Sequence, residues 1–191
     1  MTDTSAEPVD PRDELPSHLQ ALRAFAISLT RNVATADDLV QDTIVKAWTN
    51  FDKFQPGTNL RAWLFRIQRN TFYSNARKHR REVPDPEGIH AGRQFVKPDH
   101  DSKLAFSEFL VAFDRLTPEH REVLVLVGAS RYSYGEAAEM MGVAVGTVKS
   151  RANRARARLC DMLGLAEGEN PMSDLSPEMM GVAGNQDEEA A

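Results

Sequence analysis

The sequence contains few of the residues that build disulfide frameworks, membrane spans or catalytic centres. Cys160 is the single cysteine, which excludes an internal disulfide and fits a reducing, cytoplasmic location. No apolar run approaches the roughly 18 residues that span a bilayer, and the polar N-terminus does not resemble a signal peptide. The five histidines lack metal-ligand spacing, and no glycine-rich phosphate loop or nucleophile motif occurs. We therefore predict a protein without membrane association, enzymatic activity, metal or cofactor.

The charges are unevenly distributed along the chain. The formal net charge is −5, but residues 1–14 hold five acids and one arginine, and residues 166–191 hold seven acids and no cation. Residues 15–165 therefore carry a net charge of +6. A basic body indicates a nucleic-acid partner, and the composition of the two acidic tails is typical of disorder. An alternative role for the tails is to screen the basic surfaces of the same chain.

Helical periodicity dominates the first third of the chain. Apolar side chains recur with helical spacing in three segments: Leu19, Leu22, Phe25, Ala26 and Leu29; Leu39, Thr43, Ala47 and Phe51; and Leu60, Trp63, Leu64 and Ile67. We predict a compact helical domain over residues 15–82. Residues 83–103 contain three prolines, two glycines and little periodicity, which predicts a flexible linker because so long a loop is uncommon inside one domain.

A second helical domain is predicted over residues 104–165. Its first helix carries Phe106, Phe109, Leu110 and Phe113 at helical spacing. Thr117 and Pro118 are typical of a helix start, with a capping hydroxyl followed by proline at the first helical position. The predicted fold class is therefore all-α, with two small helical domains joined by a flexible linker.

The most informative segment runs from Ser133 to Leu159 and predicts a helix-turn-helix. Ser133 and Glu136 have capping-box spacing, and Gly142 stands where a left-handed residue ends a helix. The following helix has one apolar stripe, formed by Val148, Ala152, Ala155 and Leu159. At about 100° per residue, the opposite face carries Gly146, Lys149, Ser150, Asn153 and Arg154. A small, polar and cationic face suits the major groove of DNA, although Ala144 gives this helix no capping oxygen.

A second cationic helix is predicted from Asn59 to Arg81. It contains seven cations and no acid, and four aromatic residues lie among them. Cations follow phosphates and aromatic rings stack on unpaired bases, so the pattern is typical of single-strand binding. We regard Trp63 mainly as a core residue and Tyr73 as the better stacking candidate, while the Asn70 amide could read one base edge. The preceding loop, Phe51 to Asn59, is either a plain connector or part of an enclosure for an extruded base.

Acidic residues cluster upstream, in the segment DDLVQD. The helix dipole explains Asp37 and Asp38, which lie near a predicted helix start. It does not explain Gln41 and Asp42, and an acidic surface next to a DNA-binding surface repels DNA. We therefore assign this patch to a basic protein partner.

These motifs, in order, resemble the extracytoplasmic-function (ECF) sigma factors of bacterial RNA polymerase. The match runs through DDLVQD, FxPGTNLRAWLFRIxRN, LTPEHREVL and SYGEAA…GTVKSR, and covers residues 15–163. GTNLRAWLFRIQRNTFYSNARKHRREV and LVGASRYSYGEAAE are most similar to the subgroup of the alphaproteobacterial general stress response. The resemblance implies a first domain, sigma region 2, that binds the −10 element, and a second, sigma region 4, that reads the −35 element as duplex.

The resemblance also implies site residues and partners. Contact with the coiled coil of the polymerase's largest subunit falls to Asp38, Leu39, Gln41 and Asp42, and region 4 is expected at the flap of the second-largest subunit. The implied −10 residues are Phe54, Asn59, Arg61, Arg66, Arg69, Asn70, Tyr73, Arg77 and Lys78. The implied −35 residues are Thr147, Lys149, Ser150, Arg151, Asn153 and Arg154. A small helical anti-sigma factor is a further expected partner.

Two other functions compete with this interpretation. A free-standing helix-turn-helix regulator would account for residues 104–165, but not for the aromatic, basic helix or for Gln41 and Asp42. A sigma-like mimic that binds an anti-sigma factor would not need the cations Lys149, Arg151 and Arg154. Transcription from a cognate promoter with core polymerase separates these alternatives.

Overall fold

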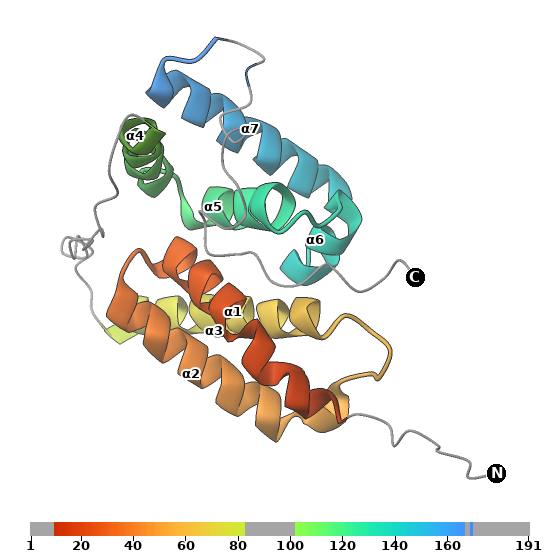
Figure 1. Cartoon of the computed structure of the whole chain (residues 1–191). Helices are drawn as coiled ribbons and strands as arrows, with labels where there is room; N and C mark the ends of the chain where they lie inside the picture. The colour runs from red at the N-terminus through yellow and green to blue at the C-terminus, as the bar shows by residue number, and fades with distance from the viewer. Residues whose placement is uncertain (1–9, 83–101, 167–168, 170–191) are drawn as a thin grey trace.

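The structure is a computed structural model that describes residues 10–82, 102–166 and 169. In these residues all regular structure is helical, which confirms the all-α class (Figure 1). Most of the predicted linker, residues 83–101, lies outside the described residues, as do residues 1–9, 167–168 and 170–191 of the predicted tails. Helix α4 begins at Ser102, so the last two residues assigned to the linker are helical.

The first bundle consists of α1 (Leu15–Thr30), α2 (Val33–Thr49) and α3 (Leu60–Glu82), which pack pairwise on one another. A short 3-10 helix, η1 (Pro11–Glu14), precedes α1, and another, η2 (Phe51–Lys53), follows α2. Arg31 ends α1 in the left-handed conformation at φ 60°, and the Asn32 side chain caps α2 by accepting from Thr35 N at 2.9 Å. The three predicted apolar stripes face this core, except that Leu19 is 43% exposed and is wrongly predicted as buried.

The second bundle consists of α4 (Ser102–Asp114), α5 (Pro118–Leu124), α6 (Tyr134–Met141) and α7 (Val145–Leu163). Thr117 caps α5 by accepting from His120 N, with Pro118 at the first helical position, as predicted. Helix α5 continues into a π-helical turn, η3 (Val125–Ala129), in which Ser130 N donates to Val125 O at 2.8 Å. Helices α4, α5 and α6 all contact α7, which is the central support of this bundle.

Helices α6 and α7 form the predicted helix-turn-helix. The capping box at the start of α6 is complete, because Ser133 N donates to Glu136 Oε2 at 2.8 Å and Glu136 N donates to Ser133 Oγ at 3.2 Å. Gly142 ends α6 at φ 64°, a conformation that costs glycine little. The predicted stripe of α7 is fully buried, with Val148, Ala152, Ala155 and Leu159 all at 0% exposure. These local expectations are confirmed.

The two bundles pack against each other, an arrangement that the sequence left open. Helix α5 lies against α1, and α6 lies against α3 (Figure 1). Most buried apolar residues of both bundles belong to one continuous cluster, and Ala26, Ala36 and Leu39 form a smaller one in the first bundle. Phe65 of the first bundle contacts Tyr132 of the second edge to face, with ring centroids 6.2 Å apart. The linked bundles therefore share a closed interface in this conformation.

Candidate nucleic-acid and polymerase interfaces

Helix α7 presents its polar face away from the core. Lys149, Ser150, Asn153 and Arg154 are all exposed, as the helical angles predicted. Arg154 Nη2 donates to Ser150 Oγ at 2.8 Å, so these two side chains form one unit on the surface. Lys149 lies 5.9 Å from the centre of the Tyr134 ring, which holds its position near the start of the helix. This face offers adjacent donors of the kind that read base edges in a major groove.

Two other predicted −35 residues occupy less open positions. Thr147 and Arg151 are half-buried, unlike the four exposed residues of the same helix. The Arg151 side chain is partly enclosed by the second bundle, and its Nη1 atom is buried. The predicted set on α7 therefore divides into four exposed residues and two half-buried ones, Thr147 and Arg151.

The loop between η2 and α3 contains a hydrogen-bonded turn. Thr58 N donates to Gln55 O at 3.1 Å across Pro56 and Gly57, and Gly57 has φ 83°, which is the pattern of a type II turn. Asn59 then caps α3 by accepting from Ala62 N at 2.9 Å. Phe54 is 8% exposed and packs on Phe51 and Trp63, so it fixes the base of the loop from inside. The turn and the cap hold the loop beside the first turn of α3.

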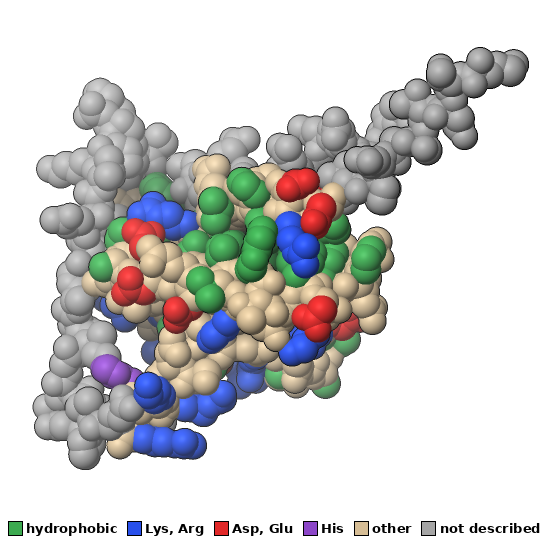
Figure 2. Space-filling model, turned by 90° about the horizontal axis from the view of Figure 1, so that it is seen from below, with side chains coloured by type: hydrophobic (Ala, Val, Ile, Leu, Met, Phe, Trp, Pro, Cys, Tyr) green, Lys and Arg blue, Asp and Glu red, His purple; other side chains and the backbone are tan. Residues whose placement is uncertain are grey.

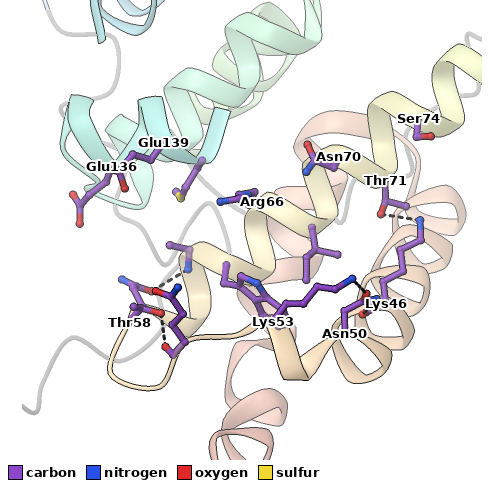
Figure 3. Close-up of a pocket in the computed structure, with 16 residues that line it drawn as sticks. Lys46, Asn50, Lys53, Thr58, Arg66, Asn70, Thr71, Ser74, Glu136 and Glu139 are labelled. Atoms are coloured by element: carbon purple, nitrogen blue, oxygen red, sulfur yellow. Dashed lines mark hydrogen bonds between the residues drawn. The ribbon is translucent and has the colours of Figure 1, made fainter. Parts of the chain in front are cut away.

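A groove of about 1040 Å³ opens next to this loop (Figure 3). It brings together three predicted −10 residues, Asn59, Arg66 and Asn70, which lie at the start and along one face of α3. Arg66 and Asn70 point into the groove from adjacent turns (Figure 3). Phe54, Arg61, Arg69 and Tyr73 do not line it. The groove has the polar and cationic lining that an unpaired nucleotide requires.

Residues that the sequence analysis missed line the groove on the α2 side. Lys46 Nζ donates to Thr71 Oγ1 at 3.0 Å, and Lys53 Nζ donates to Asn50 Oδ1 at 2.6 Å (Figure 3). Lys46 and Asn50 have an i, i+4 spacing that places them on one helix face. That spacing could have linked them, but only the packing of α2 on α3 shows that this face borders the groove.

The opposite wall of the groove is acidic and comes from the second bundle. Glu136, Glu139 and Met140 of α6 line it (Figure 3). Hydrogen bonds from the Ser133 hydroxyl and the Ser133 backbone lower the pKa of Glu136, so this group stays ionised near neutral pH. Two acids of α6 thus border the same groove as cations of the first bundle, and the Glu136 carboxylate is held by the Ser133 cap.

A second face of α3, which carries Arg69 and Tyr73, is turned toward α5. Arg69 Nε forms an ion pair with Glu122 Oε1 at 2.5 Å, and the Tyr73 hydroxyl donates to Glu122 Oε2 at 2.9 Å. The Arg69 guanidinium lies 4.8 Å from the centre of the Tyr73 ring. Burial raises the pKa of Tyr73, and the Glu122 carboxylate raises it further. Two predicted −10 residues are therefore held by the second bundle.

The remaining predicted −10 residues lie at the two ends of α3. Arg77 and Lys78 are exposed near the C-terminal end, where they line a smaller depression of about 330 Å³ with Ser74 and Arg81. Arg61 is half-buried near the N-terminal end, with its guanidinium 5.4 Å from the centre of the Phe65 ring. The predicted set is thus spread over the whole length of α3.

Helix α2 carries the predicted polymerase-binding patch. Asp38, Gln41 and Asp42 are exposed, whereas Leu39 is 4% exposed and packs with Ala26 and Ala36. The Leu39 side chain therefore anchors the patch from inside and does not reach its surface. Asp37 is engaged elsewhere, since Arg23 Nε donates to Asp37 Oδ1 at 2.6 Å.

The patch continues into exposed apolar residues that the sequence analysis did not identify. Val45 is 64% exposed and Trp48 is 59% exposed, one and two turns beyond Gln41 and Asp42. The Trp48 ring is flanked by the Arg12 guanidinium, 5.6 Å from its centre. Figure 2 views the molecule from the α2 side and shows hydrophobic side chains among acidic and basic ones on this face. Such a mixed surface is typical of a protein-binding site.

The comparisons with known proteins agree with this architecture. Residues 16–82 match the family model for Sigma-70 region 2, and residues 106–159 match the family model for Sigma-70 region 4. The chain is 52% identical over 152 residues to the ECF RNA polymerase sigma factor EcfG of Rhodopseudomonas palustris strain TIE-1. The aligned region covers 80% of this chain and 84% of that relative. The chain belongs to the extracytoplasmic-function sigma factors. The resemblance stated from the sequence motifs is thereby confirmed.

Solved structures resemble this sigma factor along most of its length. The sigma factor RpoE in complex with the anti-sigma factor NepR from Bartonella quintana gives a TM-score of 0.71 at 46% identity, over 82% of this chain and 98% of that chain. The PhyRSL–NepR complex from Sphingomonas sp. Fr1 gives a TM-score of 0.58 at 20% identity, over 81% of this chain and 90% of that chain, and shows a shared fold.

As a sigma factor, the chain binds core RNA polymerase and confers promoter recognition, while the polymerase performs the chemistry. Within residues 10–82, 102–166 and 169, no helix is long and apolar enough to cross a membrane. The same residues contain no group of three acidic, histidine or cysteine side chains that could hold a metal ion.

Proposed function

We propose that this sigma factor directs RNA polymerase to general stress promoters in the cytoplasm. Its 52% identity to EcfG and its likeness to the RpoE–NepR complex support this assignment. The observation that carries the mechanism is the presence of two cationic helices in one chain, one beside a polar groove of about 1040 Å³ and the other in a helix-turn-helix. Binding of an unpaired −10 base offsets an unstacking cost of a few kcal/mol, while −35 contacts fix the register.

In this proposal α7 reads the −35 element as intact duplex. Lys149, Ser150, Asn153 and Arg154 supply donors to base edges, because all four are exposed on one face. Thr147 supports the start of the helix, and Arg151 contributes from its half-buried position through the positive potential of the surface. The uncapped N–H groups after Ala144 suit a backbone phosphate, since helix N-termini attract anions.

The −10 element is held by the first bundle. The groove at Asn59, Arg66 and Asn70 accepts an extruded base, with Lys46 and Lys53 available for its phosphates. Arg77 and Lys78 follow the backbone further along α3, and Arg61 adds positive charge at its start. Arg69 and Tyr73 complete the strand contact once they are released from Glu122.

The exposed face of α2 binds the coiled coil of the largest polymerase subunit. Asp38, Gln41 and Asp42 match a basic partner, and Val45 and Trp48 add apolar area next to them. Region 4 is assigned to the flap of the second-largest subunit. A small helical anti-sigma factor is a further proposed partner, which the likeness to an anti-sigma complex supports.

Transcription with purified core polymerase tests this function. We expect the chain to add promoter-specific transcripts and to make bases near the start site reactive to permanganate, which modifies unpaired thymines. Specific operator binding without polymerase, together with no added transcript, would instead establish a free-standing regulator. Binding of an anti-sigma factor with no transcription on any promoter would establish a mimic.

Two variants separate the proposed roles of the first bundle. Asn70→Ala should reduce permanganate reactivity of the −10 region while leaving core affinity unchanged, because Asn70 lies in the groove and not on α2. Trp48→Ala should do the reverse and weaken core binding by about 2 kcal/mol, the cost of a typical interface anchor. Val111→Ala, at another exposed apolar residue, is the matched control for Trp48. A primary loss of core affinity in Asn70→Ala would refute its assignment.

A further inference from the structure

Helix α5 inserts two consecutive charged side chains between the bundles. Arg121 is 3% exposed, and its Nε and Nη2 atoms donate to Ser28 O at 2.5 Å and Leu29 O at 2.9 Å. These carbonyls belong to the last turn of α1, where a helix leaves its acceptors without internal partners. A cation is also favoured there by the helix dipole. Arg121 therefore fastens the second bundle to the end of α1.

Glu122 makes the companion contact with α3. Its side chain is 0% exposed and binds Arg69 and Tyr73, which are four residues apart on one face of α3. Burial raises the pKa of Glu122, whereas Arg69 and Tyr73 act to lower it. A carboxylate in this position excludes a DNA phosphate from Arg69 and an unpaired base from Tyr73. The interface and the strand therefore compete for the same two side chains.

The energetics favour a switch over a permanent support. A buried ion pair contributes little net stability compared with apolar residues of similar volume, because desolvation offsets the attraction. If the bundles separate, Glu122 returns to water, which removes its desolvation cost, and Arg69 becomes free for phosphate.

We propose that the second bundle inhibits the first in cis through the Glu122 latch, which is the contact of Glu122 with Arg69 and Tyr73. Helix α6 adds negative charge beside the same surface, because Glu136 and Glu139 line the groove that holds Arg66. The free chain withholds its −10 surface until the bundles separate. This inference rests on the proposed function, because it assigns Arg69 and Tyr73 to the promoter strand.

Glu122→Gln tests the latch in the full chain without polymerase. The probe is a fluorescent single-stranded DNA of mixed sequence, about 20 nucleotides long, which spans the site of a small single-strand binder. We expect the variant to bind it about tenfold more tightly, because a larger fraction of molecules is open and binding-competent. Spin labels at Gln20→Cys and Ala157→Cys, in a Cys160→Ser background, should report a longer distance between the bundles in the same variant.

Glu108→Gln is the matched control. Glu108 is an exposed acid on α4, so the control changes the net charge equally without touching the interface. Its DNA affinity should stay within about twofold of the wild type, as expected for a distant exposed charge. Equal tightening in both variants would reduce the effect to net charge and overturn the latch. A wild-type distance that already matches separated bundles would also overturn it.

A second variant covers the case in which Glu122→Gln does not fold. Tyr132→Leu removes the ring contact with Phe65 and leaves Glu122 in place. It should likewise open the bundles and tighten single-strand binding. If the bundles separate in Glu122→Gln or Tyr132→Leu but the affinity for single-stranded DNA does not rise, the interface does not compete with DNA.

Transcription distinguishes failure of the latch from failure of the proposed function. With saturating core polymerase, Glu122→Gln should give as much transcript as the wild type, since the bundles are then already apart. If the wild type yields no transcript with core, the proposed function fails. If the wild type transcribes and neither opening variant changes core-free DNA binding, only the latch fails.

Discussion

The two cationic helices of this sigma factor, α3 and α7, meet solvent in different ways. Helix α7 buries only its stripe of small and apolar residues and leaves Lys149, Ser150 and Arg154 open. Helix α3 has a comparable open face at Arg66 and Asn70, but a second bundle covers its other face at Arg69 and Tyr73. Cationic sequence alone therefore does not define an available DNA-binding surface. The proposed duplex-binding face is exposed in the free chain, and the proposed single-strand-binding face is partly covered.

Arg121→Ala should have the largest effect on the difference between the covered face of α3 and the open face of α7. The substitution leaves the carbonyls of Ser28, Leu29 and Leu116 without the guanidinium, and we expect the free energy of unfolding to fall by about 3 kcal/mol. Denaturant unfolding measures the loss, and hydrogen exchange should show α3 less protected while α7 keeps its protection. Arg115→Ala, at an exposed arginine, should change stability by no more than about 0.5 kcal/mol. An equal loss in both variants would assign the effect to charge.

Arg154→Ala tests whether the exposed face of α7 is available to DNA whether or not the two bundles are separated. We expect a loss of about 1–3 kcal/mol in discrimination between −35 sequences, because base-edge contacts carry specificity. The effect should be the same in the Glu122→Gln background, since α7 is open in either arrangement. Competition binding to duplex −35 DNA measures it, and Ser150→Ala should be non-additive because Arg154 donates to Ser150 Oγ. Equal weakening on every sequence would reassign Arg154 to phosphate contact.

Ser133→Ala tests the helix that connects the two surfaces, since α6 lies against α3 and leads into α7. Loss of the capping hydroxyl should lower the free energy of unfolding by about 1 kcal/mol. Ser107→Ala, at an exposed serine of α4, is the control and should be close to neutral. No difference between the two would mean that the capping box does not stabilise α6.

The smallest expected effect is the pH dependence of the same capping box. The pKa of Glu136 is lowered in the folded state, so its contribution to stability is fully present above the ordinary value of 4.5 and is lost as the pH falls through the folded value. Thermal unfolding of the wild type should therefore lose stability relative to Glu136→Gln as the pH falls below 4.5. Parallel pH profiles of the two proteins would contradict this contribution.

Local features of the fold could be predicted from the sequence because the residues concerned interact with near neighbours. Ser133 with Glu136, Thr117 with Pro118, and the stripe containing Val148 each define a cap or a helix face without reference to the rest of the chain. The same holds for the outward face of α7. Asn59, Arg66 and Asn70 were also identified, and the structure brings them together in one groove.

Features that depend on contacts between distant elements could not be predicted in this way. Leu19 has helical spacing with buried residues but lies at the edge of the stripe, where no neighbouring helix covers it. Glu122 looks like an ordinary exposed acid in a charged helix start, and only α3 supplies the partners that permit its burial. Val45 and Trp48 would be assigned to a core by composition, yet they are exposed on α2.

The bare start of α7 has a consequence for how far this protein could be stabilised. Ala144 has the extended backbone of a helix cap but no side-chain acceptor, so the first turn lacks a bond that serine or aspartate would supply. An Ala144→Asp replacement would strengthen the isolated helix and, at the same time, place a negative charge where we propose that a phosphate binds. Helix stability and promoter affinity therefore place opposite demands on this one residue, and alanine leaves the first N–H groups of α7 available to a ligand.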